Sequence, residues 1–383
     1  MGFLFDICYH LRMTAKQNKT KAILVDLIHP RMLPKQSMER MAELEELVNT
    51  YGGIVVIKKY QRRFAPHPRT YIGTGKVEEL AEEGPKLGAE LVIVNDQLKP
   101  RQMYNISESL RKSKMQVWDR IDLILKIFAK HAHTTEAKLE IELASISHMG
   151  PRIYGMGMEL SRQGGGIGTS GVGETNTEIM KRHLRARELS LREKLESCQT
   201  GRDLQRRNRK RRGLQTVAIV GYTNAGKTTL LNALTGRREY AANELFATLD
   251  TRIGSLYLPG KQKTVLVSDT IGFIRDLPPD LIKAFASTLS EAVAADLLVH
   301  VVDASDKNVF QHVRVVEDVL EKLHALATPR LIVLNKTDAV SKAVVRRVRG
   351  LMPSEIPTVA VSAATGEGIA ELVLKIEQSL ADG

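Results

Sequence analysis

The sequence predicts an α/β protein of several domains, because short Val- and Ile-rich runs alternate with amphipathic stretches in its first and last parts. Between these parts the pattern changes to long helical stripes, interrupted by a glycine-rich segment. A length of 383 residues favours two or three domains. We expect a tail (1–20), a small α/β domain (21–118), a helical hairpin with a basic linker (119–212) and a final α/β domain (213–383).

The small α/β domain is predicted from four short apolar runs with helical stretches between them. The expected strands are Ala22–Ile28, Ile54–Lys58, Glu90–Asn95 and Met115–Trp118. The expected helices are Met38–Tyr51, Val77–Leu87 and a third that begins at Pro100, since proline is favoured in the first turn of a helix. Alternation of this kind predicts a mostly parallel sheet.

The middle region is predicted to be a long antiparallel helical hairpin. Apolar residues recur at helical spacing from Ile121 to Phe128 and from Leu139 to Ile146, and Ile179–Arg212 is charged and favours helix. The glycine-rich segment Gly164–Glu174 separates the long helices and predicts a flexible tip. Arginines and lysines near Gly201–Gly213 predict a basic linker.

The final domain returns to alternating strands and helices. The expected strands are Thr216–Val220, Thr264–Ser268, Leu297–Val302, Leu331–Leu334 and Thr358–Val361. This pattern predicts a doubly wound, mostly parallel sheet of the nucleotide-binding kind.

Composition limits the class of protein. Two cysteines far apart fit a reducing compartment, and no apolar run approaches the ~18 residues of a membrane span, so we expect a cytoplasmic protein without stable membrane insertion. The net charge of +12 favours a polyanionic partner, nucleic acid before membrane, although a merely soluble basic protein is the alternative. Met13 is an alternative to Met1 as the start.

A phosphate-binding loop follows the first strand of the final domain. Residues Gly221–Thr228 match G-x-x-x-x-G-K-[ST] between a predicted strand and a predicted helix. Its glycines let main-chain N–H groups surround phosphates, Lys227 places a positive charge at the β- and γ-phosphates, and the Thr228 hydroxyl is a magnesium ligand. The motif alone predicts only a nucleoside triphosphatase.

Three further motifs follow in order, each at the carboxyl end of a predicted strand. Asp269-Thr-Ile-Gly272 supplies a carboxylate for magnesium and a glycine amide for the γ-phosphate. Asn335-Lys-Thr-Asp338 supplies a carboxylate that accepts from guanine donors that adenine lacks, and Ser362-Ala363 offers a main-chain N–H to the guanine carbonyl. Together the motifs predict a P-loop GTPase domain.

Longer strings resemble one family over nearly the whole chain from about Ala22. The runs Leu245–Asp250, Asp269–Pro278, Ser161–Gly168, Ile72–Lys76 and Asn95–Met103 closely resemble the HflX family of ribosome-associated GTPases, within the Obg-HflX superfamily. The resemblance implies that Thr248 is the switch I threonine, a magnesium ligand that senses the γ-phosphate. Three departures from the family pattern occur, at Ser170, at Val172 and in the residue after Asp250, where proline is usual.

These arguments define the expected site. The expected catalytic residues are Lys227, Thr248 and Gly272, and the expected metal ligands are Thr228, Thr248 and Asp269. The residues expected to bind GTP or GDP with Mg²⁺ are Gly221, Tyr222, Thr223, Asn224, Ala225, Gly226, Lys227, Thr228, Thr229, Phe246, Thr248, Asp269, Gly272, Asn335, Lys336, Asp338, Ser362 and Ala363.

Phe273 stands where many GTPases carry a glutamine that orients the attacking water. Phenylalanine has no donor or acceptor for this task, so we predict slow hydrolysis that a partner stimulates. Arg275 either supplies charge in cis or forms a surface ion pair.

The resemblance implies a monomeric GTPase switch that binds the large ribosomal subunit and its rRNA in the GTP state and splits or rescues stalled ribosomes. The candidate contacts are the loop 164–174 and the basic helix 181–212, whose arginines either contact RNA or pair with neighbouring acids. The alternative is a GTPase acting on a non-ribosomal RNA, protein or membrane. Gly73-Thr-Gly-Lys76 is an anion site or a plain glycine turn, and some of the family are credited with adenine-nucleotide binding in this domain.

Overall fold

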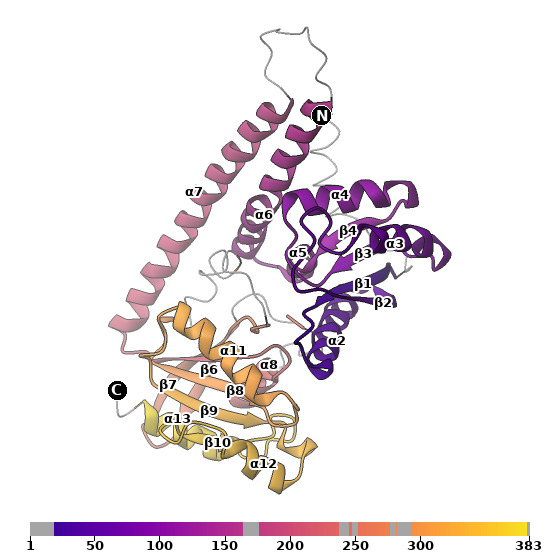
Figure 1. Ribbon diagram of the computed structural model, residues 1–383. Helices are drawn as coiled ribbons and strands as arrows, with labels where there is room; N and C mark the ends of the chain where they lie inside the picture. The colour runs from indigo at the N-terminus through magenta and orange to yellow at the C-terminus, as the bar shows by residue number, and fades with distance from the viewer. Residues whose placement is uncertain are drawn as a thin grey trace. The chain divides into compact units, whose positions relative to one another are not determined.

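The computed structural model describes residues 19–163, 176–236, 245–246, 252–275, 281 and 293–380, with the side chains of 151, 153–163, 176–177 and 210 also outside the description (Figure 1). The chain divides into two compact units, Met1–Lys130 with Ile141–Arg192 and His131–Glu140 with Glu193–Gly383. The division passes through both long helices. The four segment boundaries expected from the sequence therefore stay predictions.

The first unit contains a four-stranded parallel sheet. Its strands β1 (Lys21–Ile28), β2 (Ile54–Arg62), β3 (Leu91–Val94) and β4 (Gln116–Asp119) lie in the order β2-β1-β3-β4. Helices α2 (Pro34–Tyr51), α3 (Thr74–Lys86) and α4 (Pro100–Leu110) connect them, with a short 3₁₀ turn, η1 (Arg111–Ser113), before β4. All of β3 is buried, which explains its uninterrupted apolar sequence.

Helix α2 begins four residues before the predicted Met38, because Pro34 occupies its first turn and its preset φ suits that position. The Gln36 side chain accepts the main-chain N–H of Leu33 at 3.4 Å, which satisfies a donor at the helix start. Helix α3 begins at the Gly73–Lys76 turn, where the Gly73 N–H donates to Gln61 Oε1 at 2.7 Å and Lys76 pairs with Glu79 at 2.6 Å. The Gly73 N–H and the Lys76 ammonium, two groups that an anion would use, are thus engaged, which favours the plain glycine turn.

Three helices follow: α5 (Arg120–His131), α6 (Thr135–Gln163) and α7 (Asn176–Arg211). Two long helices on either side of the glycine-rich segment match the prediction, while the tip Gly164–Glu174 lies outside the described residues. No helix in the described part of the chain is both long enough and apolar enough to cross a bilayer.

A buried ionic cluster joins β4 and α5 to α6. Asp119, Asp122 and His148 bring ligand atoms within 4.8 Å of one another, a spacing that would suit a metal ion. The Arg152 guanidinium, however, donates to Asp122 at 2.7 Å and also to Asp119. The positive charge between the two carboxylates is therefore supplied by Arg152, and we interpret the cluster as structural.

The cluster predicts a pH dependence of stability. Burial lowers the pKa of His148, but its hydrogen bonds to Asp119 and Asp122 outweigh burial and leave the pKa raised. A histidine with a raised pKa stabilises the fold fully below its unfolded pKa of about 6.5, and this contribution is lost as the pH rises through the folded pKa. We expect urea unfolding of the wild type to lose more stability between about pH 6 and pH 8.5 than unfolding of His148→Gln. Parallel pH profiles of the two proteins would contradict this assignment.

The second unit contains a six-stranded sheet in the order β10-β9-β8-β5-β7-β6. The strands are β5 (Thr216–Gly221), β6 (Arg252–Leu258), β7 (Lys263–Asp269), β8 (Leu297–Asp303), β9 (Arg330–Asn335) and β10 (Thr358–Ala360). The described helices include α8 (Lys227–Thr235), α11 (Val309–Lys322), α12 (Lys342–Arg349) and α13 (Ile369–Ser379), with a 3₁₀ turn, η2 (Thr337–Ala339). All strand pairs are parallel except β6–β7, and β6 is an edge strand that the sequence did not predict.

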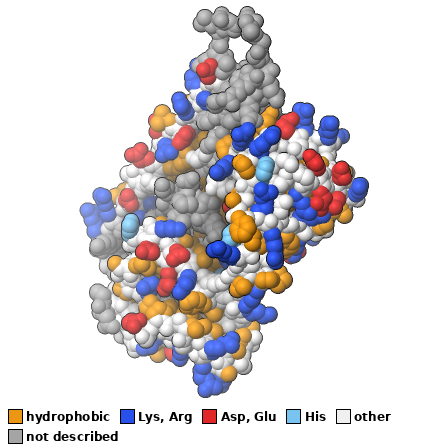
Figure 2. Space-filling view, viewed as in Figure 1, with side chains coloured by type: hydrophobic (Ala, Val, Ile, Leu, Met, Phe, Trp, Pro, Cys, Tyr) orange, Lys and Arg blue, Asp and Glu red, His pale blue; other side chains and the backbone are white. Residues whose placement is uncertain are grey.

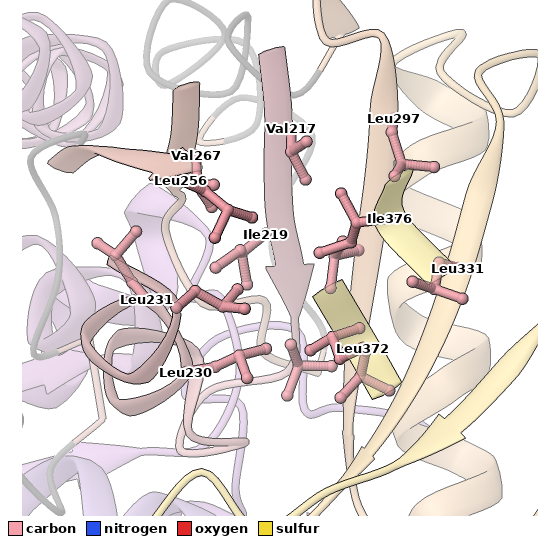
Figure 3. Close-up of a cluster of buried hydrophobic side chains, with 14 of the residues drawn as sticks. Val217, Ile219, Leu230, Leu231, Leu256, Val267, Leu297, Leu331, Leu372 and Ile376 are labelled. Atoms are coloured by element: carbon pink, nitrogen blue, oxygen red, sulfur yellow. The ribbon is translucent and has the colours of Figure 1, made fainter. Parts of the chain in front are cut away.

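One core cluster of this sheet lies between the strands and helices α8 and α13 (Figure 3), and a second includes residues of α11 and α12. Val217 and Ile219 of β5 point toward Leu230 and Leu231 of α8 on one side and Leu372 and Ile376 of α13 on the other; all six are fully buried. The strand order reverses at β5, with β7 on one side and β8 on the other. The crevice outside the carboxyl ends of strands at such a reversal is where open α/β sheets bind ligands.

Candidate nucleotide-binding site

The phosphate loop connects β5 to α8 at this reversal. Gly226 ends the loop in the left-handed region, at φ 89°, and a Cβ there would lie 2.3 Å from Asn335 Nδ2. Only glycine fits this position. Asn224, also left-handed at φ 60°, is exposed, and Thr229 lies half-buried in the first turn of the helix. The loop therefore leads into a helix N-terminus, whose main-chain N–H groups attract anions.

Lys227 is buried inside this loop. Its Nζ donates to the carbonyl oxygen of Tyr222 at 2.9 Å. Burial lowers the pKa of Lys227 to about 8, and the nearby Asp269 carboxylate opposes this shift only in part. An anion bound beside the ammonium would stabilise its charged form. The Thr223 hydroxyl is buried and has no hydrogen-bond partner in the described part of the chain, so the loop has an unused polar group as well.

Thr228 and Asp269 lie together beside the loop. The Thr228 hydroxyl donates to Asp269 Oδ2 at 2.7 Å, and Asp269, the last residue of β7, is fully buried. A hydroxyl and a carboxylate are hard oxygen ligands of the kind that Mg²⁺ prefers. The pair thus fits the predicted metal site, whose third expected ligand, Thr248, lies outside the described residues.

The segment after Asp269 pairs with the phosphate loop itself. The Thr223 N–H donates to the Phe273 carbonyl at 2.8 Å, and the Phe273 N–H donates to the Gly221 carbonyl at 3.1 Å. These bonds bring Gly272 against the loop, where a Cβ would lie 2.9 Å from Thr223 Cα and 3.0 Å from Lys227 Nζ. Phe273 is almost fully buried, at 1% exposure.

Asn335 ties the loop to the motif at the end of the sheet. Its Nδ2 donates to the Ala225 carbonyl at 2.9 Å, and its Oδ1 accepts the Ala363 N–H at 3.0 Å. The Ser362 hydroxyl in turn accepts the Thr365 N–H at 3.2 Å. One buried side chain therefore holds together two segments that are far apart in the sequence.

Lys336 and Asp338 follow Asn335 at the surface. Lys336 has a left-handed backbone, at φ 60°, and its ammonium pairs with Asp303 at 2.8 Å. Asp338 is exposed in the η2 turn, where its carboxylate is free to meet a ligand's donors.

The described members of the predicted set thus gather at one edge of the sheet, apart from Phe246, which is buried at 2% exposure with a left-handed φ of 57° and for which no contact to this edge is established. Sequence reasoning missed Asp303 as the partner of Lys336 and His312 as a neighbour of Tyr222. A carboxylate at the end of a buried strand signals the first, whereas nothing in the sequence signals the second. Arg275, for which two roles were open, donates to Gln311 Oε1 at 3.3 Å.

Known proteins resemble the chain along most of its length. Three family models match consecutive parts: "GTP-binding GTPase N-terminal" at residues 38–129, "GTP-binding GTPase Middle Region" at 131–209 and "50S ribosome-binding GTPase" at 216–336. The GTPase HflX of Caldanaerobacter subterraneus subsp. tengcongensis is 46% identical over 322 residues, which cover 84% of this chain and 73% of the relative. The GTPase HflX of Escherichia coli K12 is 40% identical over 354 residues, 92% of this chain and 82% of the relative.

Among solved structures, the crystal structure of SsGBP in complex with GDP matches 95% of this chain and 99% of its own, at 27% identity and a TM-score of 0.52. The parallel sheet, the phosphate loop and the family matches define the chain as a P-loop GTPase. GTP and GDP are its nucleotides, Mg²⁺ is the usual cofactor of this class, and GTP hydrolysis is its reaction. The chain belongs to the HflX family of GTPases, as the sequence strings indicated.

Proposed function

We propose that this chain is a cytoplasmic, monomeric GTP-driven switch that binds the large ribosomal subunit while GTP is bound and leaves after hydrolysis. The observation that carries the ribosomal part is the match of residues 216–336 to a family described as a 50S ribosome-binding GTPase. The switch part is supported by the pairing of the Phe273 segment with the phosphate loop, because a group bound at the loop can move that segment.

The phosphates of GTP are proposed to lie on the loop Gly221–Thr229, with Lys227 and the α8 N-terminus balancing their charge. Thr228, Thr248 and Asp269 are proposed to hold Mg²⁺, which when bound neutralises charge on the β- and γ-phosphates. The Thr223 hydroxyl is buried and has no partner among the described residues. This supports the placement of the phosphates on the loop, because a polar ligand bound there would satisfy the hydroxyl.

Guanine is proposed to lie between the Asn335–Asp338 segment and Ser362-Ala363. Asp338 would accept the two guanine donors, the Lys336 stem would cover one face of the base, and Asn335 would hold both segments at the correct separation. The Lys336–Asp303 ion pair supports the second role, since it anchors the end of a long side chain in one position.

Hydrolysis is proposed to depend on a partner. Phe273 is buried and offers no group that could orient a water molecule. The chain alone is therefore expected to keep GTP for long periods, and a partner that orders the site accelerates hydrolysis.

Helix α7 is proposed as one contact with rRNA. Several of its arginines already pair with acids, which makes them less suitable for RNA contacts. These pairs are Arg187 with Glu142, Arg192 with Glu188 and Arg202 with Glu136. Arg185, Arg207, Arg211 and Arg212 are exposed and form no ion pair within the described residues. Exposed arginines of this kind suit phosphate contacts. The loop 164–174 stays a proposed second contact, and splitting or rescue of stalled ribosomes is the proposed outcome.

Cosedimentation with separated ribosomal subunits tests this proposal. We expect the chain to pellet with the large subunit when a non-hydrolysable GTP analogue is bound, and much less with GDP or with the small subunit. The large subunit should also raise the rate of GTP hydrolysis.

Charge reversal supplies matched variants for the same assay. Replacing Arg207 and Arg211 of α7 and the adjacent Arg212 with Glu should weaken large-subunit binding and reduce its salt dependence. Replacing Arg346, Arg347 and Arg349 of α12, which are also exposed, should leave binding unchanged. Equal binding of both subunits in all nucleotide states, or binding to vesicles or other RNA instead, would favour a non-ribosomal partner and overturn the proposal.

A further inference from the structure

The ring of Tyr222, the second residue of the phosphate loop, stacks face to face on the imidazole of His312 in α11. The ring centroids are 3.8 Å apart, and the planes differ by only 6°. Tyr222 is buried, at 8% exposure, and His312 is half-buried. The stack fixes the direction in which the tyrosine hydroxyl points, because neither ring can tilt without losing contact with the other.

The Tyr222 hydroxyl reaches the segment that follows Gly272. It accepts the main-chain N–H of Arg275 at 3.0 Å. Together with the two main-chain bonds of Phe273 to the loop, this bond gives the segment a third attachment, two residues further along. The phosphate loop thus holds the segment through a side chain as well as through its backbone.

The other half of the stack is itself held in place. His312 Nδ1 lies 3.2 Å from Asp306 Oδ2, in the turn between β8 and α11. Burial raises the pKa of Asp306, but the hydrogen bond to His312 and the N–H of Asn308 outweigh burial and leave the pKa lowered. Gln311, next to His312 in the chain, accepts from the Arg275 guanidinium. Helix α11 therefore contacts the segment at Arg275 directly and also through Tyr222.

We propose that Tyr222 and His312 are positioning residues for GTP hydrolysis: they hold the segment after Asp269 so that the Gly272 N–H stays directed at the position of the γ-phosphate. Neither side chain needs to touch the nucleotide. This inference rests on the proposed assignment of the phosphate site. It adds a structural role for α11, which none of the four GTPase motifs includes.

The Tyr222–Arg275 bond should influence the Gly272 amide because the two positions are close together in the chain. Arg275 is three residues from Gly272, and Phe273 between them has no side-chain group to orient water. The position of the Gly272 amide therefore depends on the attachments on either side of it. Misplacement of a reacting group by about 1 Å costs roughly 100-fold in rate, so the loss of one attachment should be measurable without loss of binding.

Single-turnover hydrolysis of GTP by the full chain tests the proposal, with the affinity for GDP measured on the same variants. Tyr222→Phe keeps the aromatic ring for the stack and removes the hydroxyl that accepts the Arg275 N–H, so we expect hydrolysis to slow about fivefold, as for the loss of one hydrogen bond. His312→Ala should slow it by at least as much, because the unstacked tyrosine no longer holds its hydroxyl in place. His312→Phe, which restores a flat ring, should recover most of the rate. The Kd for GDP should stay within about twofold of the wild-type value in all three variants. Neither side chain needs to touch the nucleotide, so the substitutions should affect the hydrolysis step and not binding.

Two further variants make the test specific. In the His312→Ala background, Tyr222→Phe should have little additional effect, because both changes break one connection. Tyr257→Phe, at an exposed tyrosine on β6, should change nothing. Unchanged or faster hydrolysis in Tyr222→Phe, or an equal loss of GDP affinity, would overturn the inference. Failure of the underlying site assignment would look different: GDP binding would survive Lys227→Ala.

Discussion

Asn335→Ala is expected to lower the free energy of unfolding of the GTPase domain by about 2–4 kcal/mol and to weaken GDP binding at least tenfold. The side chain is 2% exposed, and each end of its amide has a main-chain partner. Alanine would leave the Ala225 carbonyl and the Ala363 N–H without their bonds. A buried group without its partner costs about 1–3 kcal/mol.

The same change should reduce affinity because Asn335 sets the separation of two parts of the site. Without it, the phosphate loop at Ala225 and the segment at Ala363 are no longer fixed to each other. GDP must then order both segments on binding, and this ordering offsets part of the binding free energy. Urea unfolding of the nucleotide-free protein and titration with fluorescent GDP measure the two effects separately.

Asp338→Asn is the matched comparison. It replaces one of the two carboxylate oxygens proposed to accept from guanine with an amide NH2 donor, while both Asn335 bonds remain, so guanine binding should weaken with little change in the unfolding of the nucleotide-free protein. Asn105→Ala removes one side-chain bond, to the Arg69 carbonyl, in the other compact unit and should leave GDP binding unchanged. If Asn335→Ala had the wild-type free energy of unfolding, the bonds of Asn335 to Ala225 and Ala363 would not be what connects the two segments.

The sequence predicted the parts of this fold that depend on local patterns. Buried parallel strands such as Leu91–Val94 carry continuous apolar runs, and the GTPase motifs follow strands because open α/β sheets bind ligands at the carboxyl ends of their strands. Strand β6 was not predicted. Its burial alternates, as expected for an edge strand with one face covered, and it pairs antiparallel with β7. A sequence reading based on buried runs does not detect such a strand.

Contacts between distant side chains were beyond prediction from one sequence. The Tyr222–His312 stack joins residues 90 positions apart, and the Arg202–Glu136 pair joins two different helices. The sequence left open whether the arginines of the helix 181–212 contact RNA or pair with acids, and the structure shows Arg202 and Arg206 paired with acids. Residue identity predicts what a side chain can do, but only the fold decides which partner it meets first.

Gly272→Ala is expected to reduce GTP hydrolysis by roughly 100-fold while GDP still binds normally. The new Cβ would lie 2.8 Å from Thr223 Cγ2 and 2.9 Å from Thr223 Cα. The side chain of Thr223 can rotate, but its Cα belongs to the phosphate loop, which α8 and the Phe273 bonds hold in place. The segment that contains residue 272 must therefore move away from the loop, and its N–H moves with it.

GDP binding should be spared because GDP has no γ-phosphate for that N–H to meet, so a displaced segment loses no contact with it. Single-turnover hydrolysis and GDP titration on one preparation distinguish this result from general damage to the site. Gly201→Ala is the control, since a Cβ at Gly201 in α7 meets no atom within 4 Å. If Gly272→Ala hydrolysed GTP at the wild-type rate, the close approach of residue 272 to Thr223 would have no role in the reaction. If it lost GDP binding as well, Gly272 would be needed for the shape of the phosphate loop itself, and the hydrolytic role of its N–H would lose its support.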